Sequence, residues 1–180
     1  MNMPTSIKNH EEYLLGVLRR IFLLHRVAFA VTIAEKLYPN YVAFSKNKNW
    51  GDPNVLRGAL DEIWKSIEEG QLMKNDSVVQ LRKKIEDVTP DMDEFGSEIQ
   101  GSLALDAAAA VYSALECSFN GSPEEAVSVA HSALSSKYME LEGSGERLEQ
   151  SSEVQEEIKK QCELLERLQK LSKISRDALK

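Results

Sequence analysis

Asp106 is the residue best placed to do chemistry, because it is a lone charge within a long apolar stretch. No other charged residue lies between Gly101 and Glu116, and the stretch is rich in Ala, Leu and Val. A helix of this composition is buried on most of its sides. A buried carboxylate needs a cation or hydrogen-bond donors, or it becomes protonated. We therefore expect Asp106 either to tie this helix to a neighbour, which is the commoner role, or to act as a buried acid. The candidate partners are Lys36, Arg57, Lys137, the Trp64 indole and the end of a neighbouring helix.

Other carboxylates could join Asp106 in the core of a helical bundle. Such clusters bind two metal ions in ferritin-like proteins, which also use Glu-x-x-His pairs. This sequence has no such pair, no metal-spaced Cys and His residues, and no glycine-rich phosphate loop, HExxH or GxSxG motif. We therefore expect no metal, no cofactor and no recognisable catalytic residue. The acids that could gather are Glu35, Asp61, Glu62 and Glu140, and the buried polar cluster that we single out is Glu35, Asp106 and Glu140.

Aromatic residues concentrate between positions 38 and 64 of the chain. A group of this kind usually fills the space where helices meet. The alternative is that it lines a pocket or a surface for a partner, together with the polar residues beside it. The candidate ligand or partner surface is Tyr38, Asn40, Tyr41, Trp50, Asp52 and Trp64.

The same stretch predicts three helices joined by two corners. A helix over 26–37 should end before Pro39, because proline disfavours a helical conformation at the residue that precedes it. Asn40 is then placed to cap a short helix over 41–46. Asp52 followed by Pro53 predicts the start of a third helix, since a carboxylate caps the first turn and proline suits its first position.

The whole chain is predicted to be all-α, a single domain over 1–180 with seven or eight helices. Residues 1–9 are expected to be a loose end. The segment 146–180 is expected to form one long amphipathic helix, which either packs back on its own domain or serves for association. The other helices expected from apolar spacing cover 11–20, 53–67, 78–88, 103–119 and 123–142.

Composition limits the classes of function. The net charge of −7 and the pI near 5.1 argue against nucleic-acid binding, which usually needs a basic face. The oily stretch 14–34 is not expected to span a membrane, because Arg19, Arg20 and Arg26 would be costly inside a bilayer. Cys117 and Cys162 suggest no disulfide framework, and with no signal peptide they indicate a reducing cytoplasm.

Several short motifs occur along the chain at a specific spacing. They are Glu35, Tyr38-Pro39-Asn40-Tyr41, Gly51-Asp52, Ile63-Trp64, Pro90 with Phe95, Leu105-Asp106-Ala107 and Met139-Glu140. Together they resemble the pattern of the YjaG-like family of bacterial proteins, the domain-of-unknown-function 416 family. The resemblance extends over residues 24–145 and continues weakly beyond them. It implies an all-helical cytoplasmic protein, with no catalytic or binding residue to carry over. The first expectation is therefore a non-catalytic protein that binds a protein partner or a second copy of itself. The alternative is an enzyme or small-ligand binder that uses a buried carboxylate cluster around Asp106, with Glu35 and Glu140, in a pocket floored by Trp64.

Overall fold

The computed structural model describes residues 6–96, 98–141 and 151–179, and this part of the chain is helical with no strand. The predicted all-α class is confirmed. Seven helices have at least 12 residues, while α5 and α9 have 4 residues each. The helices are α1 (Ile7–Leu18), α2 (Leu23–Lys48), α3 (Pro53–Glu68), α4 (Asn75–Asp87), α5 (Met92–Phe95), α6 (Ile99–Asn120), α7 (Pro123–Leu141), α8 (Ser152–Lys170) and α9 (Arg176–Leu179).

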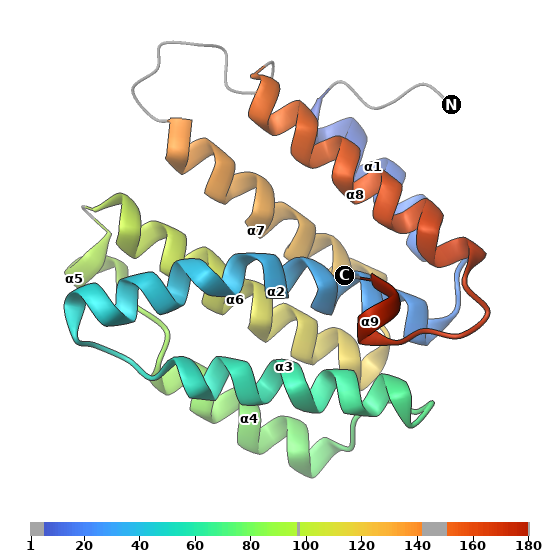
Figure 1. The fold of residues 1–180 in the computed structure, drawn as a ribbon, viewed down its shortest axis with the longest axis horizontal. Helices are drawn as coiled ribbons and strands as arrows, with labels where there is room; N and C mark the ends of the chain where they lie inside the picture. The colour runs from blue at the N-terminus through green and yellow to red at the C-terminus, as the bar shows by residue number, and fades with distance from the viewer. Residues whose placement is uncertain (1–5, 97, 142–150, 180) are drawn as a thin grey trace.

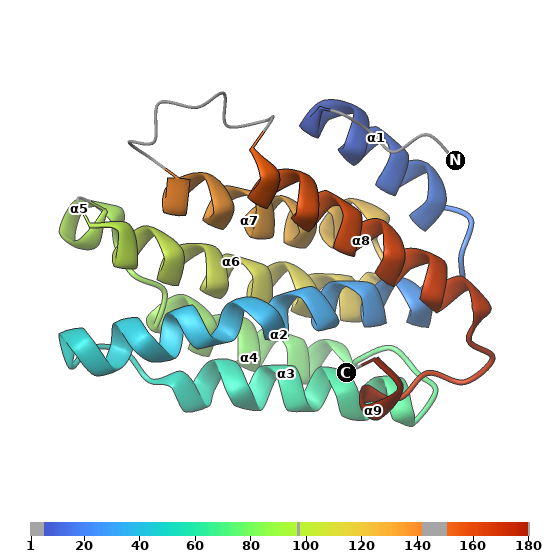
Figure 2. The same cartoon turned by 45° about the horizontal axis from the view of Figure 1, so that its top comes forward.

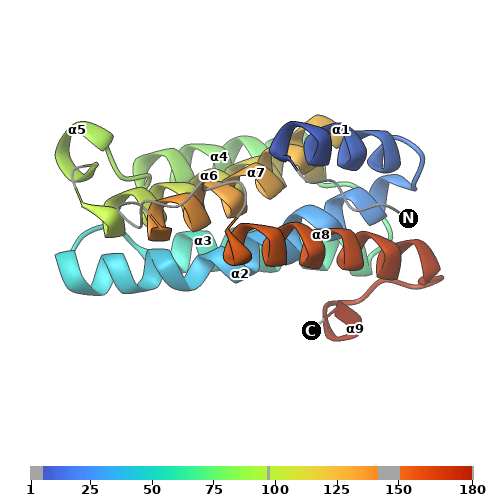
Figure 3. The same ribbon diagram turned by 90° about the horizontal axis from the view of Figure 1, so that it is seen from above.

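Two long helices, α2 and α6, form the centre of the bundle and make its most extensive contact. α3 packs against both of them, and α4 lies beyond α3 and α6 (Figure 1). On the opposite side α7 covers α2 and α6, and α1 and α8 lie over α7 (Figures 2 and 3). None of the helices in the described residues is long and apolar enough to cross a membrane.

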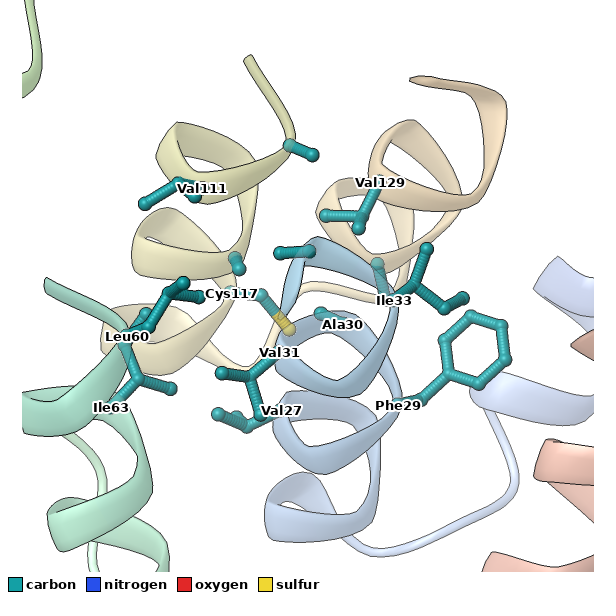
Figure 4. Close-up of a cluster of buried hydrophobic side chains, with 14 of the residues drawn as sticks. Val27, Phe29, Ala30, Val31, Ile33, Leu60, Ile63, Val111, Cys117 and Val129 are labelled. Carbon is teal, nitrogen blue, oxygen red and sulfur yellow. The ribbon is translucent and has the colours of Figure 1, made fainter. Parts of the chain in front are cut away.

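The core depends on α2, whose residues from Val27 to Ala34 are all buried. Figure 4 shows Val27 and Val31 facing Leu60 and Ile63 on α3, while other side chains of α2 lie between α6 and α7. α6 contributes mainly alanines, and five of them have no exposed surface. Small side chains allow helix axes to approach closely. Because α2 is surrounded by other helices, its residues line more than one pocket of the protein.

Pro39 does not end a helix, contrary to the prediction from its sequence neighbours. It lies within α2, which continues to Lys48, so Asn40 is a helical residue and caps nothing. A proline inside a helix costs about 3 kcal/mol. Here Tyr41 and Phe44, both fully buried, extend the apolar face of α2 beyond the proline. Their burial offsets this cost, since a large apolar side chain contributes roughly 1.5–3 kcal/mol when it leaves water.

Helix starts that depend on local capping chemistry are confirmed. The Asn54 amide donates to Asp52 Oδ1 at 2.9 Å, and Pro53 is the first residue of α3. The Glu125 amide donates to Ser122 Oγ at 3.1 Å at the start of α7. The start of α6 was placed too late, because this helix begins at Ile99 and not at residue 103.

The two ends of the chain also differ from the prediction. α1 begins at Ile7, where Ser6 Oγ accepts from the Asn9 amide at 3.3 Å, so residues 7–9 are helical and not loose. Near the other end, the expected helix over 146–180 stops at Lys170, and a separate turn, α9, follows. Residues 1–5 and 142–150, which include parts of both predictions, lie outside the described residues.

Candidate ligand pockets on either side of Lys36

A pocket of about 470 Å³ lies between α2, α7 and α8, three helices that contact one another in pairs. We call it the lysine pocket. It takes in Asn40 and Glu140 from the set that the sequence suggested. Its lining residues are Ile33, Lys36, Leu37, Asn40, Ala133, Ser136, Lys137, Glu140, Glu157 and Lys160.

Each of the three helices contributes one lysine to this pocket, namely Lys36, Lys137 and Lys160. With Glu140 and Glu157 the lining carries a formal charge of +3 − 2 = +1, whereas the chain as a whole carries −7. Lys137 Nζ lies 2.7 Å from Glu140 Oε2 on the same helix. The lysine pocket is therefore a locally basic hollow in an acidic protein.

A buried hydrogen-bond network supports one wall of the lysine pocket. Glu157 is only 8% exposed, and its Oε1 accepts from Gln161 Nε2 at 2.8 Å. The same amide nitrogen donates to the Ala130 carbonyl at 3.1 Å, so the Gln161 oxygen is left to accept from His10 Nε2, 2.8 Å away. Burial lowers the pKa of His10, although the bond to Gln161 opposes this shift. The wall is thus fixed to both α1 and α7.

A second pocket, of about 210 Å³, lies between α2, α3 and α9. We call it the Trp64 pocket. It brings together Glu35 and Trp64, which the sequence had suggested for one pocket, but neither Asp106 nor Glu140 lines it. Its lining residues are Thr32, Glu35, Lys36, Trp64, Arg176 and Leu179.

Two carboxylates and two guanidinium groups alternate beside the Trp64 pocket. Arg57 Nη2 lies 2.7 Å from Glu35 Oε1 and 2.9 Å from Asp61 Oδ1. Arg176 bridges the same two oxygens, with its Nη1 at 2.9 Å from Asp61 Oδ1. Burial alone would lower the pKa of Arg57, but the hydrogen bond and negative charge of Glu35 raise it above the ordinary value. Arg57 also lies over the Tyr38 ring, 5.4 Å from its centroid.

Asp106 has a partner that the sequence did not suggest. Ser136 Oγ on α7 donates to Asp106 Oδ2 at 3.0 Å. Among the described residues, none of the proposed cationic partners bonds to this carboxylate, which is half-buried. Burial raises the pKa of Asp106, and the hydrogen bonds from Ser136 and Ser135 oppose the shift. Asp106 thus ties α6 to α7 through serine.

The suggested polar cluster of Glu35, Asp106 and Glu140 does not form one hydrogen-bonded group. Glu35 pairs with two arginines, Asp106 with Ser136, and Glu140 with Lys137. In the part of the chain that the structure describes, no group of three His, Cys, Asp or Glu side chains could hold a metal ion.

The residues suggested as a ligand or partner surface fall into two groups, one that fills the core and one that lies at or beside the pockets. Tyr41 is fully buried, its hydroxyl donates to the Val88 carbonyl at 2.5 Å, and burial raises its pKa to about 12. Trp50 packs on Phe44 and Phe95, with ring centroids 5.9 Å and 5.2 Å away. Tyr41 and Trp50 therefore fill the corner, and Asp52 caps α3. The other members of the set, Tyr38, Asn40 and Trp64, lie at or beside the two pockets.

Several pocket residues had not been identified from the sequence. Glu157 and Lys160 belong to α8, where charged residues every few positions are typical of a solvated helix face. Arg176 pairs with a residue 141 positions away. Spacing along the chain gives no signal for such contacts, because only the packing of α8 and α9 on α2 creates them.

Comparison with known proteins places the chain in a family. A family model described as "Protein of unknown function (DUF416)" matches residues 16–180. The uncharacterized protein YjaG of Escherichia coli is 29% identical over 125 residues, which make up 68% of this chain and 61% of that protein. Its counterpart in Salmonella typhimurium is 28% identical over the same shares. The match thus spans about three fifths of the length of these relatives.

A solved structure supports the same assignment at the level of the fold. The crystal structure of a DUF416 family protein from Shewanella baltica has a TM-score of 0.76 to this chain at 24% identity. The similarity covers 92% of this chain and 88% of that one. Because the family model also matches from residue 16 to residue 180, the chain belongs to the DUF416 family, as the motifs in its sequence predicted.

Proposed function

We propose that this protein binds a small anionic ligand in the lysine pocket. The observation that carries the proposal is the convergence of Lys36, Lys137 and Lys160 from three different helices around one hollow. Lysine ammonium groups bind phosphate and carboxylate oxygens as point charges. A protein with a net charge of −7 repels anions in general, so a basic pocket on it favours anions at that place alone.

The rest of the lining defines the ligand further. The volume of about 470 Å³ falls within the range of pockets for small molecules, roughly 300–1,000 Å³. Lys160 Nζ lies 3.7 Å from Glu156 Oε1, and Glu157, which is buried, has no ion pair within the described residues. A buried carboxylate of this kind needs further donors. The ligand therefore carries an anionic group for the lysines and a hydroxyl or amino donor for Glu157.

The pocket favours binding over catalysis. None of its lining residues is histidine or cysteine. Ser136 is the lining residue with a hydroxyl group. It is 1% exposed and donates a hydrogen bond to Asp106, so it is not presented as a nucleophile. The proposal keeps the non-catalytic role expected from the sequence, but its first candidate ligand is a small molecule and not a protein partner.

A thermal-shift experiment with inorganic phosphate, citrate and a sugar phosphate tests the proposal. A ligand that binds only the folded state raises the melting temperature. At a hundredfold excess over its dissociation constant, it adds about 2.7 kcal/mol to the free energy of unfolding. The double variant Lys137→Gln/Lys160→Gln should lose the shift. The matched control is Lys83→Gln/Lys84→Gln, which removes the same charge from the exposed face of α4 and should retain it.

Two results would overturn the lysine pocket as a binding site. One is the absence of a shift with all three probes, measured against chloride at equal ionic strength. The other is an equal shift in both double variants, which would mean that the anion screens the overall charge of the protein and does not occupy the pocket.

A second proposal is self-association through an apolar tip formed by Phe22, Leu23 and Phe119. Phe22 is 80% exposed, and Leu23 and Phe119 are 45% and 37% exposed. Leu23 lies against Gly121, two residues after Phe119, so the three residues belong to the same end of the bundle (Figure 1). Exposed aromatic groups of this kind are enriched at protein interfaces, and homodimers commonly pair one patch with its copy. The mass of the protein in solution tests this proposal.

A further inference from the structure

Three buried N–H groups beside the Trp64 pocket have no hydrogen-bond partner among the described residues. They are Nε1 of Trp64 and Nε of Arg176, which both line the pocket, and Nε of Arg57, which pairs with the lining residue Glu35. Trp64 is 3% exposed, so water does not reach its indole from the surface. Buried donors of this kind are rare, since each loses its hydrogen bonds to water without replacement. All three require the same thing, an oxygen atom that accepts.

We propose that the Trp64 pocket is a second binding site, which takes the carboxylate group of a short-chain organic acid. Two of the three unpartnered donors belong to guanidinium groups, the side chains that recognise carboxylates best. This site shares Lys36 with the lysine pocket, but its three unpartnered donors belong to residues outside that pocket, and it does not depend on the function proposed there.

The charges around the pocket favour an anion over a cation. Glu35 and Asp61 already accept from both arginines, and their negative charge is therefore compensated. Lys36, which also lines the pocket, adds a third positive charge, so the five groups sum to +3 − 2 = +1. A monovalent carboxylate would bring this sum to zero.

The remaining walls select a short apolar chain behind the carboxylate. Leu179 and the Trp64 ring give the pocket apolar surface. The Thr32 hydroxyl is already used, because it donates to the Ala28 carbonyl at 2.7 Å. With a volume of about 210 Å³, the space suits a small acid such as butyrate and not a nucleotide or a peptide.

Access to the three donors requires a small movement of α9. This helix is a single turn of 4 residues, and Arg176 and Leu179 connect it to the pocket. Leu179 is 7% exposed, which is a modest hydrophobic anchor. Elements with few buried contacts open at low free energy, so we expect α9 to shift as the acid enters, with Arg176 turning its Nε toward the ligand.

Tryptophan fluorescence provides a direct test, because the chain has two tryptophans and only Trp64 lies at this pocket. In Trp50→Phe the emission reports on Trp64 alone. Titration with sodium butyrate should change this emission saturably, whereas sodium chloride at equal concentration should not. The reciprocal variant, Trp64→Phe, leaves Trp50 as the reporter and should show no change.

Arginine variants connect the fluorescence change to the unpartnered donors. Arg57→Lys keeps the positive charge beside Glu35 but removes the guanidinium Nε, and it should weaken butyrate binding at least tenfold. The matched control is Arg82→Lys, which makes the same replacement at the Arg82–Glu116 ion pair on α4 and α6 and should bind normally. Circular dichroism of each variant verifies that the helices remain folded.

The outcomes separate cleanly. Saturable binding that Arg57→Lys weakens and Arg82→Lys does not weaken supports the site. No saturable change in Trp50→Phe, or a change that Arg57→Lys leaves intact, overturns it and identifies the three donors as positions satisfied by ordered water. The Lys137→Gln/Lys160→Gln variant should bind butyrate normally, so a failure of this site remains distinguishable from a failure of the lysine pocket.

Discussion

Individual residues in this protein take their roles from what packs around them. His10 is the clearest case, since it is fully buried and its Nε2 donates to Gln161 next to Glu157. Its other ring nitrogen lies 3.9 Å from Cys162 Sγ, which leaves that nitrogen as an acceptor. The neutral imidazole therefore fits this place, and the imidazolium does not.

This arrangement predicts a loss of stability in mild acid. The pKa of His10 is lowered from 6.5 in the folded state, so the unfolded chain binds a proton first as the pH falls. The stability from neutral His10 is complete above pH 6.5 and decreases below it, by at most about 1.4 kcal/mol per pH unit. Urea unfolding between about pH 7.5 and about pH 5.5 measures this slope. His10→Gln should flatten the curve.

The charged groups near His10 determine which variant is a suitable control for His10→Gln. Glu11 opposes the shift through its negative charge, and Glu157 lies at the far end of the same hydrogen-bond chain. His131 is exposed and lies 2.7 Å from Glu11 Oε1. His131→Gln therefore tests the surface pair alone and should keep the acid slope. If His10→Gln lost as much stability on acidification as the unmodified protein, the burial of the imidazole would not be its cause.

At the scale of helices, replacement of Pro39 in α2 is expected to stabilise the protein. The residue is exposed and lies in the middle of a helix of 26 residues. Proline has no N–H for the helix bond and crowds the preceding turn, at a cost of about 3 kcal/mol. Pro39→Ala should therefore raise the free energy of unfolding by roughly 1–3 kcal/mol, after the entropy that proline removes from the unfolded chain is deducted. Thermal or urea unfolding measures the gain.

A matched proline at a helix start provides the comparison. Pro53 occupies the first position of α3, where no helix bond to its nitrogen is lost. Pro53→Ala should leave the stability unchanged or slightly lower it. A destabilised Pro39→Ala variant would show that the proline ring contributes packing that outweighs the missing hydrogen bond.

These helices show what sequence alone can predict. Asp52 and Ser122 each accept from a backbone amide within three residues, and the start of α3 was predicted from Asp52 and Pro53. Pro39 was misread because burial of Tyr41 and Phe44, further along α2, overrides the local preference. The same limit applies to the pockets.

For the pockets, sequence reasoning reached only the residues on or near the central helices. Glu35 and Trp64 were suggested and do meet. Arg176 and Lys160 were not suggested, because they reach the pockets only through the docking of α8 and α9. Asp106 was correctly expected to need a partner. Ser136 was not predicted as that partner, because nothing in the sequence around a helical serine indicates which carboxylate it will contact.

The molecule as a whole has an elongated shape with α5 at one end and the loop between α1 and α2 at the other (Figure 1). The apolar tip of Phe22, Leu23 and Phe119 lies at this second end, and none of its three residues lines either pocket. Variants of the tip therefore change no pocket residue, and ligand binding and self-association can be tested separately.

Phe22→Ser is a suitable variant for this last test, because it removes the exposed ring without harming the helix beside it. Phe22 occupies the N-cap position of α2 and makes no capping hydrogen bond, whereas serine is among the best residues there. The variant should be at least as stable as the unmodified protein. If the tip associates, light scattering at tens of micromolar will give a mass above the 20.2 kDa of one chain, and Phe22→Ser will return it to that value. Val79→Ser, at an exposed apolar position on α4, should not change the mass. A monomeric mass for the unmodified protein would exclude self-association at that concentration and leave the tip to a different protein partner.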